Sequence, residues 1–136
     1  PPTTTTLPAA ICDTIPAGPA FASIKCRLAA LRDRINAEPG LGTFQEKVRS
    51  KVELALQEAN EAIDTCRSGT LSPARAGLKR VAKKLGLYRH ILASRGARKK
   101  LEPGLRTSFL GLGDPIKQDV GTLKAQLACP DDAPAE

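Results

Sequence analysis

A run of basic side chains in the second half of the chain is the first candidate for binding chemistry. The stretch SPARAGLKRVAKKLGLYRHILASRGARKK, residues 72–100, carries ten Lys or Arg residues and no acidic residue. Cations spaced three or four residues apart share one side of a helix, where they attract an anionic polymer. The candidate anion-binding residues are Arg75, Lys79, Arg80, Lys83 and Lys84 on one helix face, and Arg98, Lys99 and Lys100 in the turn that follows it.

The alternative interpretation is the solvated side of an ordinary bundle helix, neutralised by an acidic helix beside it. Residues 1–70 carry eight basic and eight acidic groups, whereas residues 71–136 carry thirteen basic and six, so the whole net charge of +7 belongs to the second half. Only Tyr88 and His90 could stack near the basic run, so we do not expect recognition of nucleic acid bases. An anionic glycan or the cell surface is a better candidate ligand than nucleic acid.

Catalytic and metal-binding patterns are sparse. His90 is the single histidine, and it lies within the basic run. The chain has no GxSxG, GxGxxG or HExxH motif and no phosphate-binding loop; FLGLGDP holds one GxG and follows no expected strand. We therefore expect no enzymatic activity, no cofactor and no metal site.

Four amphipathic helices are expected to position these residues. The first spans about residues 23–36 with Ser23 as its N-cap, and the second begins near Thr43, in a capping box with Glu46, and stops at Gly69. Their apolar stripes are Ile24, Leu28, Leu31 and Ile35, and then Phe44, Val48, Val52, Ala55, Ala59 and Ile63.

The third and fourth helices are marked by proline. The third is expected to have Ser72 as N-cap and Pro73 at its first position, and to end near residues 94–96. The fourth begins near residues 101–106, and Pro115 predicts a kink or a break because it has no N–H to donate. Their stripes are Ala74, Leu78, Val81, Leu85, Tyr88 and Leu92, and then Leu105, Phe109, Leu112, Ile116, Val120, Leu123 and Leu127.

Short connections between one-sided helices predict an all-α fold, an antiparallel up-down four-helix bundle with disulfides at one end. A helical hairpin inserted into another fold is the competing architecture. We expect the bundle to span residues 21–129, between a Pro/Thr-rich tether at 1–20 and a polar tail at 130–136. No apolar run is long enough to span a membrane.

The cysteines are expected to gather at one end of such a bundle. Cys26 begins the first helix, Cys66 ends the second, Cys129 follows the fourth, and Cys12 is near in sequence. Cys66 lies on the apolar side of its helix and Cys26 does not, which favours Cys12–Cys26 and Cys66–Cys129. The pairing Cys26–Cys129 with Cys12–Cys66 stays open. Redox catalysis is disfavoured because there is no CxxC, so structural disulfides predict an extracellular or periplasmic protein.

The segment from "ALQEANEAIDTC" through "GTLKAQL" resembles helical accessory modules of secreted bacterial proteins, of which the FIMAH domain is the named example. The shared pattern is a helix, a small-residue turn, a second amphipathic helix, a basic turn and a Pro-started last helix. The resemblance implies a non-enzymatic extracellular module that is attached to, or assembles with, a protein partner or further copies of itself. A polyanion-binding module that uses the basic face is the alternative.

Overall fold

The structure, a computed structural model, describes Cys12, Ile15 and residues 17–129. The tail expected at 130–136 and most of the tether expected at 1–20 lie outside the described residues. Four long helices make up the fold: α2 (Phe21–Asn36), α3 (Phe44–Arg67), α4 (Leu71–Ala93) and α6 (Pro103–Gln126). A 3₁₀ turn, η1 (Pro39–Leu41), precedes α3, and the short helix α5 (Arg95–Lys100) lies between α4 and α6.

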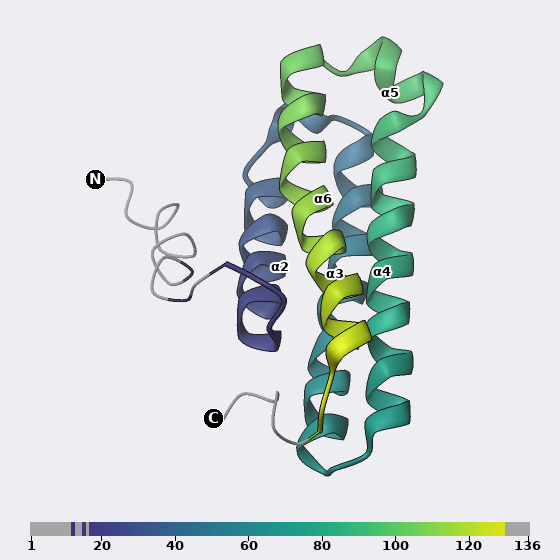
Figure 1. Ribbon diagram of the computed structural model, residues 1–136. Helices are drawn as coiled ribbons and strands as arrows, with labels where there is room; N and C mark the ends of the chain where they lie inside the picture. The colour runs from purple at the N-terminus through teal and green to yellow at the C-terminus, as the bar shows by residue number, and fades with distance from the viewer. Residues whose placement is uncertain (1–11, 13–14, 16, 130–136) are drawn as a thin grey trace, which may run out of the picture.

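The long helices form the predicted all-α bundle. Figure 1 shows consecutive long helices running in opposite directions, with α5 capping one end. Helix α3 packs between α2 and α4, and α6 packs on α4 and, less extensively, on α2. The connections between the long helices, residues 37–43, 68–70 and 94–102, are short, which is why each helix reverses onto the one before it.

The stripes counted from the sequence face the core. All the expected apolar residues of α2, α3 and α4 are buried. On α6 the residues Phe109, Ile116, Val120, Leu123 and Leu127 are buried, but Leu105 and Leu112 are only half-buried. Gly113 is buried instead, because the ring of Tyr88 lies where a side chain at position 113 would be.

Three of the predicted N-terminal capping interactions are absent. Helix α2 begins at Phe21 after Ala20, so Ser23 lies inside the helix and is buried. Burial of Phe21 explains the extra turn, because adding an apolar residue to the packed face stabilises a helix more than a cap does. Helix α4 begins at Leu71 after Thr70, which places Ser72 inside the helix.

The capping box expected at Thr43 is the third. Thr43 precedes α3 but its side chain caps no backbone N–H, and the Glu46 carboxylate pairs with Arg49 instead. The stop at Gly69 is confirmed: Gly69 has a left-handed φ of 87°, and its N–H donates to the Cys66 carbonyl over 2.9 Å.

Two further differences concern α5 and α6. The basic turn expected after α4 is a short helix, capped by Ser94, whose hydroxyl accepts from the Ala97 N–H at 3.2 Å, and held by buried Ala97. Helix α6 runs through Pro115 without a break. Pro115 deprives only the carbonyl of Gly111 of its helical donor, and because Gly111 is exposed, water can serve that carbonyl.

Candidate anion-binding site

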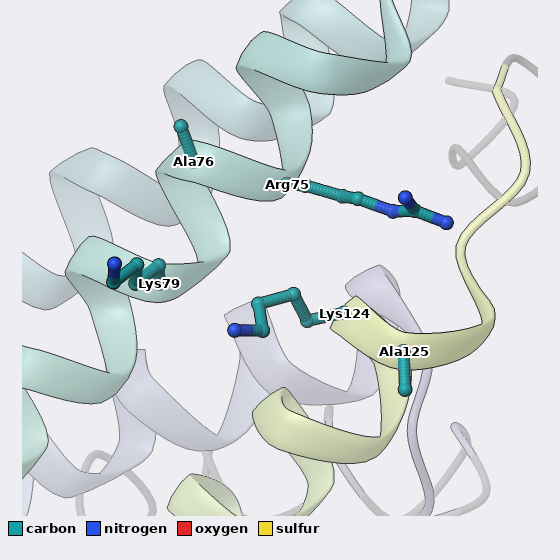
Figure 2. Close-up of a pocket in the computed structure, with 5 residues that line it drawn as sticks. All are labelled: Arg75, Ala76, Lys79, Lys124 and Ala125. Atoms are coloured by element: carbon teal, nitrogen blue, oxygen red, sulfur yellow. The ribbon is translucent and has the colours of Figure 1, made fainter.

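A hollow between α4 and α6 gathers cations from both helices (Figure 2). Its volume is about 390 Å³, and its walls are Arg75, Ala76, Lys79, Lys124 and Ala125. Arg75 and Lys79 rise from the first turns of α4, and Lys124 rises from the last turn of α6. We call this hollow the basic groove.

The helical period and the packing of α4 beside α6 explain why these three residues line one hollow. Arg75 and Lys79 are one turn apart, so they project from the same edge of α4. Lys124 follows buried Leu123 and therefore lies at the margin of the core face of α6. Because α4 and α6 are antiparallel, the start of one lies beside the end of the other (Figure 1).

No carboxylate neutralises the basic groove from within the described part of the chain. Over residues 17–129, no ion pair joins Arg75, Lys79 or Lys124 to Asp or Glu. Three like charges around one hollow repel each other and raise the local concentration of anions. The positive charge of the groove therefore favours binding of an anion.

The structure divides the basic face predicted on α4. Arg80 lies on the opposite edge of the helix, where its Nε donates to Oε1 of Glu58 on α3 at 2.8 Å. That hydrogen bond, helped by the nearby charges of Glu58 and Glu61, raises the pKa of Arg80. The expectation that Arg80 extends the face of Arg75 and Lys79 is therefore wrong, whereas neutralisation by the preceding acidic helix is found for Arg80.

The remaining candidate residues lie either on one of these two edges of α4 or on α5. Lys84 follows Arg80 by one turn on the edge toward α3, and exposed Lys83 follows Lys79 by one turn. The remaining three belong to α5, at the end of the bundle away from the basic groove, and all are exposed: Arg98, Lys99 and Lys100. We call these three residues the turn cluster, and it is separate from the basic groove.

Sequence reasoning missed Lys124 because it searched only one helix. Lys117, two turns earlier on α6, also reaches α4, since a Cβ added at Gly86 would lie 3.6 Å from its Cε. Further along the same seam, Arg89 of α4 donates to Asp114 of α6 at 2.8 Å. Matching the two helices in antiparallel register would have found these neighbours, but only after α6 was known to lie beside α4.

Two disulfides fasten the bundle, and one of them joins the chain after α6 to α3. Cys12 is bonded to Cys26 and Cys66 to Cys129, the pairing that the helix faces favoured. The second bond brings the Cα atoms of its cysteines to 4.9 Å and fixes the chain after α6 to the last turn of α3. It thereby holds the last turn of α6, which carries Lys124, against the bundle.

Features of other kinds of site are sparse in the described part of the chain. Among the residues that the structure describes, no cluster of three His, Cys, Asp or Glu side chains is suited to a metal ion. Within the same residues, no helix is long and apolar enough to cross a bilayer. His90 is exposed on α4.

A second hollow, of about 340 Å³, lies along α2 and α3 and carries mixed charge. We call it the mixed groove, and its lining residues are Arg32, Glu53, Leu56, Gln57, Asn60, Glu61 and Asp64.

Comparison of the chain with protein-family models, with curated proteins and with solved structures returns no match. The resemblance to FIMAH-like modules therefore stays a prediction from the sequence pattern.

Proposed function

We propose that this chain is a non-enzymatic interaction module of an extracellular or periplasmic protein, and that it binds anionic polysaccharides through the basic groove. The observation that carries the proposal is the set of three cations in that groove without a carboxylate partner among the described residues. Arg80, by contrast, has its partner on α3. A cationic groove left without internal neutralisation favours an external polyanion.

The lining of the groove favours a charged polymer over a nucleic acid base. None of the residues that line it is aromatic, so it offers no surface for stacking. Arg75 can form two parallel hydrogen bonds with a sulfate or a carboxylate, whereas the two lysines act as point charges. Binding should therefore depend strongly on salt and weakly on the sequence of the polymer.

The two disulfides support an oxidising compartment, because such bonds persist outside the cytosol. We also propose that the chain is a helical accessory module of a secreted bacterial protein, similar to FIMAH domains. In that role the Pro/Thr-rich residues 1–20 would serve as its tether.

Heparin chromatography with the folded, oxidised chain tests the binding proposal. The groove variant carries Arg75→Glu, Lys79→Glu and Lys124→Glu. The control variant carries Lys25→Glu, Arg34→Glu and Lys51→Glu on α2 and α3. Each substitution changes the charge by two, so both variants have a formal net charge of +1 in place of +7.

We expect the control variant to keep most of its heparin retention and the groove variant to lose it. A binding titration over several salt concentrations gives the slope of log K against log salt, which is negative for a polyanion. Removing three cation contacts should make this slope less negative by roughly 2 to 3. Equal loss in both variants would mean that retention follows net charge alone, and the groove would then be no site.

A third variant separates the groove from the turn cluster. Arg98→Glu, Lys99→Glu and Lys100→Glu make the same charge change on α5. We expect this variant to behave like the control. If it alone loses retention, the polyanion binds at the α5 end and the proposed site is wrong.

A further inference from the structure

The two disulfides determine where a pulling force can travel through this chain. The bond Cys12–Cys26 closes a loop with a sequence separation of 14, and the bond Cys66–Cys129 closes one of 63. A pull on the chain outside Cys12 and Cys129 crosses both bonds, because a closed covalent loop cannot be extended. The tension therefore runs from Cys26 along α2, η1 and α3 to Cys66.

Helices α4, α5 and α6 lie off this path. All three fall between Cys66 and Cys129, so the force passes from one cysteine to the other without stretching them. The cations of the basic groove belong to the same shielded segment: Arg75, Lys79 and Lys124.

The pulled pair of helices is loaded so that it unzips. Cys26 is near the start of α2 and Cys66 is at the end of α3, and these two points lie toward the same end of the bundle (Figure 1). Contacts of α2 therefore break one after another from that end. The ion pair of Arg27 with Asp119 of α6, at 2.7 Å, is among the contacts near that end.

Helix α3 is held more closely than α2. A Cβ added at Gly77 of α4 would lie 2.9 Å from the Cβ of Ala62, so the backbones of α3 and α4 nearly touch. The Cys66–Cys129 bond also ties α3 to the chain after α6. Helix α2 should therefore detach first and leave α3, α4 and α6 packed together.

We propose that the two disulfides protect the basic groove when the two ends of the chain are pulled apart, because they route that tension through α2 and α3. The part of this proposal that concerns a retained ligand rests on the proposed function. The routing of force does not, because it follows from the covalent connections alone.

Single-molecule tweezers test the routing, with handles on residues 1 and 136 of the oxidised chain. Full unfolding should release at most about 140 Å, the reach of the chain from Cys26 to Cys66. The first step should mark the release of α2 up to Phe44, which frees a segment with an extended reach of about 60 Å.

Two cysteine variants are matched controls. Cys66→Ser with Cys129→Ser should add roughly 210–230 Å to the released length, whereas Cys12→Ser with Cys26→Ser should add only about 50 Å. Reducing the wild-type chain with dithiothreitol gives both increments in a molecule known to have folded. If the oxidised wild type extends as far as the reduced chain, the routing is refuted.

Fluorescent heparin, added while the chain is held just beyond the first step, tests whether the groove stays closed. The wild type should keep the label, and the groove variant should never acquire it. Loss of the label at the first step would overturn the proposed protection of the groove. Absence of label at zero force would instead contradict the proposed function and leave the measured lengths unaffected.

Discussion

The two grooves of the bundle, one along α2 and α3 and the other between α4 and α6, have similar volumes but opposite ways of handling charge. In the mixed groove Glu53 accepts from Arg49 at 2.9 Å, and Arg32 donates to Asp33 at 3.2 Å. In the basic groove, no carboxylate of the described residues pairs with a lining cation.

The difference shows that helical packing alone does not create the candidate site. Both grooves arise where neighbouring amphipathic helices meet, and both are lined by long polar side chains. What distinguishes them is that α3 carries both acids and bases, so Arg49 pairs with Glu53 and Arg67 pairs with Asp64 within one turn of the same helix. Helix α4 carries no acid, so its charges need a partner from another element, and among the described residues Arg80 and Arg89 have one, Glu58 and Asp114.

Breaking the link between the two regions should have the largest effect. The Cys66–Cys129 bond joins α3, which lines the mixed groove, to the end of α6, which lines the basic one. We expect Cys66→Ala with Cys129→Ala to lower the free energy of unfolding by on the order of 4 kcal/mol, because a long loop is freed in the unfolded state. Urea denaturation measures it. Cys12→Ala with Cys26→Ala should cost less, on the order of 3 kcal/mol.

A glycine pair tests how tightly α6 is packed behind the basic groove. At Gly113 a new Cβ would lie 2.6 Å from Cε2 of buried Tyr88, whereas at Gly111 it would meet nothing within 4 Å. Gly113→Ala should destabilise the protein by about 1–3 kcal/mol through overpacking. Gly111→Ala should stabilise it by up to about 1 kcal/mol through helix propensity. Equal thermal midpoints for the two variants would contradict this packing.

The hydroxyl of Tyr88 joins α4 to α6 in the core and should have a smaller effect. It donates to the Phe109 carbonyl at 2.7 Å, and Tyr88→Phe should cost about 1 kcal/mol in a denaturant titration.

The same hydroxyl should make stability depend on pH. Burial, and then the charge of Asp114, raises the pKa of Tyr88. A tyrosine whose pKa is raised by folding stabilises the native state below its unfolded pKa, near 10, and this stability is lost as the pH rises above that value. Tyr88→Phe should therefore weaken the loss of stability between about pH 10 and 12. An unchanged alkaline limb would exclude ionisation of Tyr88 as its cause.

The smallest effect concerns charge repulsion within the basic groove. Lys79→Glu places a carboxylate one turn from Arg75 and should raise stability by roughly 0.2–0.5 kcal/mol at low salt. Glu58→Gln, on the α3 edge, removes the partner of Arg80 and should lower it. Both differences should vanish in 1 M salt because screening removes them. If Lys79→Glu destabilises at low salt, the groove cations do not repel each other.

The sequence by itself determined the four long helices, their buried stripes and the favoured cysteine pairing. These features follow from the 3.6-residue period, which is local and can be counted. The cap residues were less predictable. Helix α2 begins before Ser23 because Phe21 is buried, and Glu46 pairs with Arg49 and not with the backbone of Thr43.

Only the tertiary structure decided which cations form the candidate site. Counting around α4 showed a basic side but not which neighbour each edge would meet. Packing beside α3 neutralised Arg80 with Glu58, and packing beside α6 brought Lys124 to Arg75 and Lys79. The physical reason is that a helix face is set by nearby residues, whereas its counter-charges come from segments distant in the chain.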